Sequence, residues 1–370
     1  MKTSVLIITN SIQGLLSFRK ELLNTLIERG YNIKVAAPFH EEMRILHNHG
    51  IETIPVYNLS RRGINPFKDL KLLSEYKKII KTYNPSIVLT YTIKPNIYGG
   101  LACTSLKIPY IVNITGLGTA VEEPGLLQKL TIGMYKMAMR GASCIFFQNK
   151  ANLEFFKSKG IRPDLHQLIP GSGVNIDHHR YQPYPSEDEP IRFLYISRLI
   201  RQKGIDEYLA TAEAIKKSNK KIEFHILGSC EKEYEGKLET LRHSDTVIYH
   251  GRQKDVRPFI AKSHCLIHPS FYPEGMSNVV LESEAAGRPV ITTRRPGCQE
   301  PIEENVTGFL ITPQSTGELI QAVKRFIKLP YEEKVRMGYN ARAKVAREFN
   351  REIVVGRYLK EIDRIINSKS

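Results

Sequence analysis

The chain has 370 residues, of which 41% are hydrophobic, and its formal net charge is +16. This length is too great for one ordinary core and suits two domains of a soluble globular protein. No run of about 18 apolar residues is present, which argues against a membrane-spanning helix, and the apolar run at residues 5–8 is too short for a secretory signal. The five cysteines lack metal-ligand spacing, so we expect reduced thiols in the cytoplasm.

The positive charge is concentrated in the first half of the chain. Residues 1–170 contain 22 lysines and arginines against 11 aspartates and glutamates, which leaves a charge of +11. Such an excess indicates an anionic partner, and nucleic acid, acidic lipid and a phosphorylated substrate all qualify. The sequence contains no recognised nucleic-acid module and no basic run interleaved with aromatic residues, so we expect no nucleic-acid partner.

Buried strands and helices alternate through the first half. Strands are predicted at residues 1–9, 31–37, 52–56, 87–91, 110–113 and 144–148, and helices at 15–29, 66–83, 96–106, 126–141 and 150–159. This alternation opens like a Rossmann unit, although the G-x-G-x-x-G pattern of nicotinamide enzymes is absent. Gly14, in the predicted loop 10–14, is a candidate for ligand contact, while a tight turn would require a glycine equally well.

A second alternation follows the Pro- and acid-rich residues 181–190, which we interpret as a linker. Strands are predicted at residues 192–197, 223–227, 247–250 and 265–268. The pattern predicts an α/β protein with two Rossmann-like domains facing across a cleft. A long basic helix is predicted at residues 331–368, with a break near 349–350.

Residues 270–293 contain two glutamates, Glu274 and Glu282, with seven residues between them. We expect Glu274 in the loop after a strand and Glu282 roughly two turns down the helix that follows. The amides of a helix N-terminus attract phosphate, and small residues at Gly275 and Ser277 allow a ligand to approach the backbone. The alternative is a surface loop and helix with two solvated acids.

The segment from Glu274-Gly275 to Leu281-Glu282, followed by Ala-Ala-Gly-Arg-Pro-Val, resembles the E-x7-E signature of the family 4 retaining glycosyltransferases. The resemblance implies a GT-B fold, with Glu274 on the donor sugar and Glu282 on the ribose. Residues 197–204 are similar to the family's G-R-L-x-x-x-K-G, with serine in place of the first glycine. Arg198 and Lys203 would then neutralise a diphosphate leaving group; otherwise they belong to a basic loop on a basic protein.

The resemblance implies further site residues. Additional donor contacts are expected at Met276, Ser277, Asn278, Val279 and Gly228. Arg252 lies where the family holds the nucleotide base, and a solvated arginine is an equal alternative. Thr115 and Gly116 follow a strand near the place where many members carry a histidine, which this chain lacks, so no general base is assigned. Lys94 could meet an anionic acceptor or simply face solvent.

By resemblance, residues 1–178 form an acceptor-binding domain, residues 188–345 a nucleotide-sugar-binding domain, and residues 346–370 a helix that crosses back to the first. The expected activity is retaining, metal-independent transfer of an N-acetylhexosamine or hexose from a UDP-sugar, without a cofactor. The acceptor would be a polyprenyl-diphosphate-linked or other glycan of bacterial surface polysaccharide or glycoprotein assembly. Transferases that add N-acetylgalactosamine to an undecaprenyl-diphosphate sugar are similar. The alternative is a nucleotide-sugar 2-epimerase, which needs acids and histidines around the sugar.

Two basic amphipathic segments point to the cytoplasmic face of a membrane. They are residues 61–81, which begin with Arg61 and Arg62, and residues 126–140. We expect Phe67, Leu70 and Leu73 to pack against the first sheet, and the neighbouring lysines to bind an anionic lipid surface.

Overall fold

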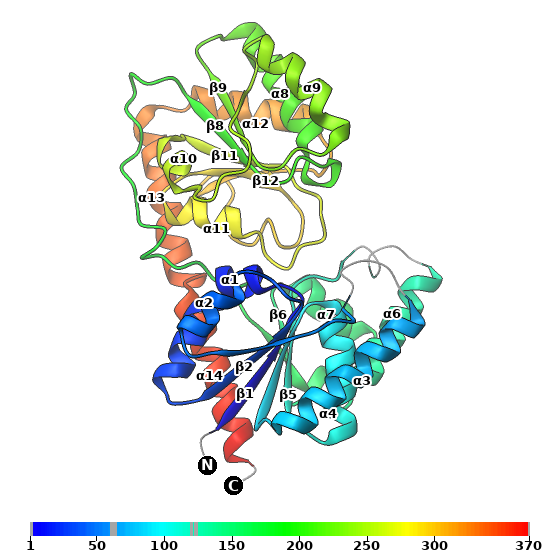
Figure 1. The fold of residues 1–370 in the computed structure, drawn as a ribbon. Coiled ribbons are helices and arrows are strands. Elements are labelled where there is room, and N and C mark those ends of the chain that lie inside the picture. Colours follow the sequence, from blue (N-terminus) through cyan, green and yellow to red (C-terminus); the bar gives the residue numbers. More distant parts are fainter. Residues whose placement is uncertain (1–2, 60–64, 119–120, 122–124, 369–370) are drawn as a thin grey trace. The chain divides into compact units, whose positions relative to one another are not determined.

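The computed structural model describes residues 3–59, 65–118, 121 and 125–368, which form two compact units (Figure 1). Unit 1 comprises Met1–Ser172, Pro273–Met276 and Arg351–Ser370, and unit 2 comprises Gly173–Tyr272 and Ser277–Asn350. Arg61 and Arg62, which entered the sequence predictions, lie outside the described residues.

Unit 1 is built on a parallel sheet whose strands are ordered β3-β2-β1-β4-β5-β6-β7. The strands are β1 (Ser4–Ile8), β2 (Asn32–Ala37), β3 (Glu52–Pro55), β4 (Ile87–Tyr91), β5 (Tyr110–Ile114), β6 (Cys144–Phe147) and β7 (His166–Leu168). Because helices cover both faces, the central strands consist of continuous apolar runs, as the sequence predicted.

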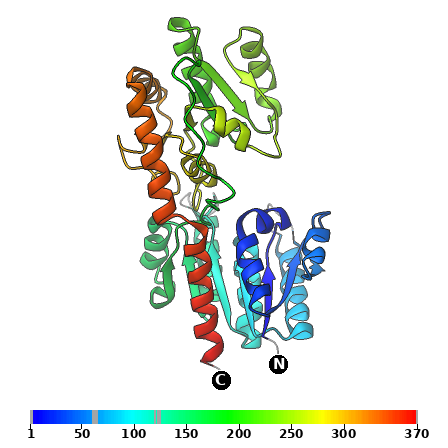
Figure 2. The same ribbon diagram turned by 90° about the vertical axis from the view of Figure 1, so that its left-hand side faces the viewer.

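The helices of unit 1 divide between the two faces. The first face carries α1 (Ile12–Glu28), α2 (Met43–Asn48) and α14 (Arg351–Asn367). The second carries α3 (Pro66–Tyr83), the π-helical turn Pro95–Gly99 with α4 (Gly100–Leu106), α6 (Leu126–Ala138) and α7 (Lys150–Ser158). Figure 2 shows α14 in red along the first face.

Helix α1 begins earlier than the sequence predicted. The Oγ atom of Ser11 accepts a hydrogen bond from the Gly14 amide at 3.0 Å, so Ser11 caps the helix and Ile12 is its first residue. Gly14 therefore lies inside the first turn of α1, and the predicted loop at residues 10–14 is wrong. This glycine has ordinary helical geometry rather than the special backbone of a phosphate-binding turn.

Unit 2 repeats the same topology. Its strands are β8 (Arg192–Ile196), β9 (Glu223–Leu227), β10 (Ile248–Tyr249), β11 (Cys265–His268), β12 (Val290–Thr293) and β13 (Gly308–Ile311). They pair in parallel in the order β10-β9-β8-β11-β12-β13. This order corresponds to β3-β2-β1-β4-β5-β6 of unit 1, so the predicted pair of Rossmann-like α/β domains is confirmed.

Helices also cover the sheet of unit 2. They are α8 (Ile205–Ser218), α9 (Lys232–His243), α10 (Arg257–Lys262), α11 (Asn278–Ala285), α12 (Thr316–Lys328) and α13 (Tyr331–Glu348). The predicted break in the last helix is confirmed, because α13 ends at Glu348 and α14 begins at Arg351. Within the described part of the chain, no helix is both long and apolar enough to cross a membrane.

A buried arginine of unit 2 forms hydrogen bonds with the backbone of the predicted linker. Arg288 is fully buried and donates to the backbone carbonyls of Gln182, Pro183, Ile260 and Ala261. Burial lowers the pKa of its guanidinium to about 10. Residues 182–183 are therefore an ordered part of unit 2. The arginine of the Ala-Ala-Gly-Arg-Pro-Val segment is explained by this structural role.

Candidate active site

In unit 2, the order in which the chain adds strands to the sheet reverses at β8. The chain adds β9 and β10 on one side of β8 and then returns to place β11 on the other. In open parallel sheets, ligands bind outside the carboxyl ends of the strands at such a switch point. The loops that follow β8 and β11 are therefore the first place in unit 2 to look for a ligand site.

These two loops are joined to each other. The Phe271 amide donates to the Gln202 carbonyl at 3.0 Å. Gly204 has a φ of +72°, and a Cβ atom at this position would overlap with the carbonyl of Pro269. The glycine is therefore required both by its backbone conformation and by the close approach of the loop after β11.

The loop after β8 carries the two predicted phosphate ligands. The Arg198 side chain is exposed and, among the described residues, has no carboxylate within salt-bridge distance. The Lys203 ammonium lies over the ring of Tyr272, 4.8 Å from its centroid. Both residues thus belong to one short segment at the switch point, although their function in ligand binding remains a prediction.

Helix α11 begins beside this loop, and Ser277 is its N-cap residue. The Ser277 side chain does not cap the helix, because its Oγ atom lies 3.1 Å from Nε2 of His268. The Ser277 amide donates to the Gly297 carbonyl at 2.6 Å, and the donor contact expected at Ser277 stays a prediction. The first-turn amides of Asn278 and Val279 precede the helical hydrogen-bonding pattern and are the remaining candidates.

Glu282 and Glu284 are both carried by α11 but have different environments. Glu282 is half-buried, whereas Glu284 is completely buried. Burial raises the pKa of the Glu284 carboxyl well above its usual value, which favours the neutral acid. The spacing of the signature selected Glu282, and no sequence signal distinguished the buried acid two residues later.

The loops after β9 and β10 meet at Gly228. Its amide donates to the Gly251 carbonyl at 2.9 Å, and its φ of +148° together with the nearby Ser197 carbonyl leaves no room for a side chain. Arg252 is exposed just beyond Gly251. The preceding His250 stacks on His225 with 5.2 Å between ring centroids, and burial lowers the pKa of both imidazoles.

The segment with Glu274 belongs to unit 1, which the sequence did not indicate. Nδ2 of Asn149 donates to the carbonyls of Glu274 and Gly275, at 3.2 and 2.7 Å. Oδ1 of the same side chain accepts from the Asn152 amide at 2.8 Å and caps α7. The buried Asn149 therefore anchors the Glu274 segment, and the polar pair Gln148-Asn149 after a buried strand was the available sequence signal.

The loop after β5 lies against the same segment. A Cβ atom on Gly116, whose φ is +140°, would lie 3.1 Å from the Pro273 carbonyl oxygen and 3.2 Å from the Gly275 nitrogen. A Cβ atom on Gly275 would lie 2.5 Å from the Thr115 carbonyl oxygen. Thr115 and Gly116 thus lie beside the Glu274 segment, as an arrangement around one ligand would require.

Lys94 forms an ion pair that the sequence did not predict. Its Nζ atom lies 2.8 Å from Oδ1 of Asp69, and the two side chains are only 15% and 4% exposed. The ammonium is therefore held against α3 instead of facing solvent, so the interpretation of Lys94 as a solvated lysine is wrong. Its assignment to the acceptor remains a prediction.

The candidate residues thus form two groups. Unit 2 holds Arg198, Lys203, Gly228, Arg252, Ser277, Asn278, Val279 and Glu282, and unit 1 holds Gly14, Lys94, Thr115, Gly116, Glu274, Gly275 and Met276. Among the residues that the structure describes, no group of three or more His, Cys, Asp or Glu side chains could hold a metal ion.

Two family models match this chain. Residues 180–344 match glycosyl transferases group 1, and residues 10–149 match glycosyl transferase 4-like. A relative from Campylobacter jejuni, N,N'-diacetylbacillosaminyl-diphospho-undecaprenol alpha-1,3-N-acetylgalactosaminyltransferase, is 27% identical over 95% of this chain and 96% of its own length. The capsular polysaccharide biosynthesis glycosyltransferase CapM of Staphylococcus aureus is 24% identical over 88% of each chain.

Solved structures with the same fold extend over nearly the whole chain. Anabaena HepE in complex with UDP has a TM-score of 0.79 at 19% identity and covers 98% of this chain and 100% of its own. Sucrose-phosphate synthase from Thermosynechococcus elongatus has a TM-score of 0.79 at 18% identity, with 100% of each chain covered. The predicted family and fold are confirmed: residues 10–149 match the glycosyl transferase 4-like model, residues 180–344 match the group 1 glycosyl transferases, and the chain has the GT-B fold.

Proposed function

We propose that this glycosyltransferase moves a sugar, an N-acetylhexosamine or a hexose, from a UDP-sugar to a polyprenyl-diphosphate-linked or other glycan acceptor, with retention of the anomeric configuration. The observation that carries the proposal is the switch point of unit 2. There, the cationic segment with Arg198 and Lys203 adjoins the loop that leads to the amides at the start of α11. Cationic side chains and first-turn amides together suit a nucleoside diphosphate.

The chemistry follows from the charge that develops when the sugar leaves. Departure of UDP builds negative charge on the oxygen that linked it to the sugar. Arg198, Lys203 and the Asn278 and Val279 amides would stabilise this charge, as fixed donors do in other active sites. The two cationic side chains supply the charge stabilisation for which other transferases use a metal ion. The departing phosphate then takes the proton from the acceptor hydroxyl on the same face of the sugar.

The two glutamates of the signature act on different parts of the donor in this proposal. Glu274 accepts hydrogen bonds from hydroxyls of the transferred sugar, and its position depends on the Asn149 side chain. Glu282, half-buried on α11, accepts hydrogen bonds from the ribose. Thr115 and Gly116, which lie against the Glu274 segment, would border the sugar, and Arg252 would border the base.

The acceptor is inferred from the relatives. The relative from Campylobacter jejuni is named for transfer of N-acetylgalactosamine to an undecaprenol-linked diphosphosugar, and CapM is named for capsular polysaccharide biosynthesis. A chain similar to the first over nearly its whole length supports an acceptor of the same chemical class. Such a lipid cannot leave the bilayer, so the enzyme must reach the membrane surface.

The surface of unit 1 supports peripheral binding to the membrane. We expected Phe67 and Leu70 to pack against the sheet, but they are 81% and 64% exposed, because Leu72 and Tyr76 form the buried face of α3 instead. Exposed apolar side chains also occupy the start of α6, namely Leu126, Leu127 and Leu130. Exposed lysines flank both groups, namely Lys68, Lys71 and Lys129. Apolar side chains with basic neighbours suit the cytoplasmic, anionic face of a membrane.

A transfer assay tests the proposal. The protein is incubated with UDP-, GDP- and ADP-sugars, each with and without a polyprenyl-diphosphate-linked sugar, and the products are identified by mass spectrometry. We expect a lipid-linked product that is one sugar longer and has an α-linkage when an α-linked UDP-sugar is the donor, with activity kept in EDTA. An inverted linkage would contradict retention. Conversion of the donor without acceptor to its 2-epimer would identify an epimerase instead.

A further inference from the structure

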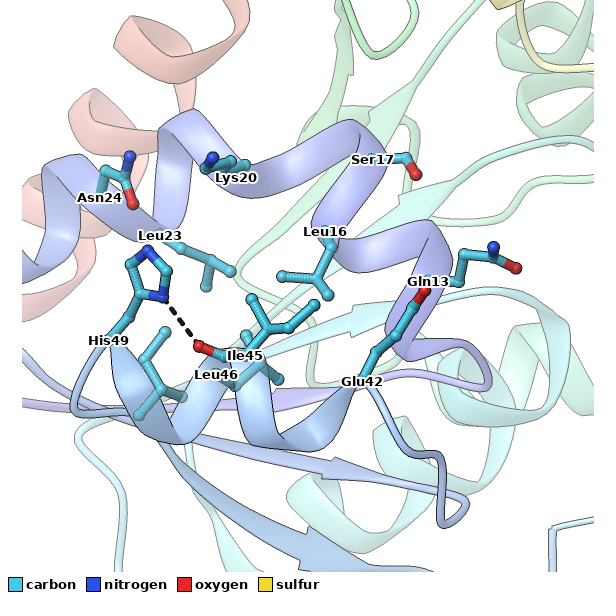
Figure 3. A pocket seen from close by; sticks show the side chains of 11 residues that line it. Gln13, Leu16, Ser17, Lys20, Leu23, Asn24, Glu42, Ile45, Leu46 and His49 are labelled. Atoms are coloured by element: carbon cyan, nitrogen blue, oxygen red, sulfur yellow. Dashed lines mark hydrogen bonds between the residues drawn. The ribbon is translucent and has the colours of Figure 1, made fainter. Parts of the chain in front are cut away.

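A groove between α1 and α2 of unit 1 has no role in the proposed chemistry (Figure 3). Its volume is about 300 Å³, which is within the range of small-molecule sites. The apolar lining consists of Leu16, Leu23, Ile45, Leu46 and Ile51. The polar lining consists of Gln13, Ser17, Lys20, Asn24, Glu42 and His49. Figure 3 shows Leu16, Leu23 and Ile45 between the two helices.

The polar residues of α1 form a stripe along the groove. Gln13, Ser17, Lys20 and Asn24 recur every three or four residues, so they lie on one face of the helix. Among the described residues, none of these four side chains has a hydrogen-bond partner in the protein. The stripe extends over about 16 Å of helix at 1.5 Å per residue, and it offers amide, hydroxyl and ammonium groups to a ligand.

The α2 side supplies hydrogen-bond acceptors. Oε2 of Glu42 is buried and has no hydrogen-bond partner among the described residues; the nearest cationic candidate, Nδ1 of His40, is 3.8 Å away. Nδ1 of His49 lies 2.8 Å from the Ile45 carbonyl, shown as a dashed line in Figure 3. Because a carbonyl only accepts, this nitrogen carries a proton and donates the hydrogen bond.

The chemistry of the groove selects its ligand. One cation, Lys20, and one carboxylate, Glu42, leave it nearly neutral in a chain of net charge +16, so it does not suit a phosphate. A hydrocarbon chain would cover the polar groups on both sides without pairing them, which is unfavourable. The hydroxyl groups of a sugar both donate and accept hydrogen bonds, so they can pair with the polar groups on both sides of the groove. An acetamido group adds an amide that can bond to the polar sides and a methyl group that can contact the apolar residues.

We propose that this groove binds the neutral glycan part of the acceptor, which contains acetamido sugars. The inference rests on the proposed function and adds a second contact region to it. The end with Gln13 and Glu42 lies just after β1 and β2, at the carboxyl edge of the sheet, and the end with Asn24 and His49 lies further along the two helices. A glycan can thus extend from that edge into the groove.

Binding to an oligosaccharide array tests the proposal. The full-length protein is applied to glycans that vary in charge and in N-acetylhexosamine content. We expect binding to neutral glycans with N-acetylhexosamine, and at least tenfold weaker binding by Ser17→Trp, whose indole fills the groove. Arg44→Trp is the matched control, because Arg44 is exposed on α2 outside the groove, and it should bind like wild type. The double variant Lys20→Ala with Asn24→Ala should bind at least fivefold more weakly.

Several results would overturn the proposal. They are the absence of binding to neutral glycans, a preference for acidic glycans, and equal binding by Ser17→Trp and wild type. Competition by farnesol would assign the groove to a lipid chain instead. Stabilisation by UDP is measured on the same preparations by thermal shift. If UDP stabilises the protein but no glycan binds, only the proposed glycan groove is refuted. If UDP does not stabilise the protein, the proposed function itself is contradicted.

Discussion

Asn149 offers a test of how unit 1 positions Glu274. Asn149→Asp preserves the size of the side chain and the Oδ1 atom that caps α7, but it replaces the donor Nδ2 with an oxygen facing two carbonyls. Each lost hydrogen bond is worth about 0.5–1.5 kcal/mol, so the segment is held less firmly by roughly 1–3 kcal/mol. If that energy is expressed in the transition state, kcat falls about 5- to 150-fold.

The assay separates positioning from folding. Steady-state rates of transfer are measured beside UDP affinity and the melting temperature, and we expect kcat to fall while UDP affinity stays within about twofold of wild type. Asn65→Asp is the matched control, because Asn65 caps α3 through the Lys68 amide at 3.1 Å and does not contact Glu274. A kcat within twofold of wild type for Asn149→Asp would refute the positioning role, as would a parallel loss of UDP affinity.

Three other predictions address the charges and the surface. Arg198→Ala and Lys203→Ala should each lower kcat about 100- to 1000-fold with unchanged circular dichroism; near wild-type turnover in both would exclude the phosphate role. Burial lowers the pKa of His264 to about 4, so folding favours the neutral imidazole, and the stability of the fold should decrease as pH falls from about 6.5 toward 4. In His264→Asn the melting temperature should depend less on pH over this range. Phe67→Asp combined with Leu126→Asp should weaken sedimentation with anionic vesicles, and equal sedimentation would exclude this surface.

The fold could be predicted because its signals are local. The first strand of each unit is a short apolar run, and helical patterns separate it from the next, so the alternation alone indicates parallel sheets. The start of α1 was missed because Ser11 already caps the helix three residues before the glycine that we took for the turn. The exposure of Phe67 was also missed, because the apolar residues of α3 fit two overlapping faces and only packing selects one.

The candidate site shows where sequence reasoning ends. We attributed Gly275 and Ser277 to the approach of a ligand, since small residues at a helix N-terminus commonly have that purpose. The structure gives Gly275 a structural explanation, because a Cβ atom there would overlap with the Thr115 carbonyl, and it shows the Ser277 amide donating to the Gly297 carbonyl. Both partners are distant in the sequence, so no local pattern could reveal them.

The same contacts change how the signature is understood. Seven residues separate its two glutamates, yet Glu274 belongs to unit 1 and Glu282 to unit 2. Two glutamates that are close in sequence therefore belong to different units. Gly275, which follows the first glutamate, allows the backbone of that segment to pack against the Thr115 carbonyl. Asn149, which donates to the Glu274 carbonyl, and Gly116, which lies against the same segment, are far from the signature in sequence. Substitutions there should alter transfer without touching either glutamate.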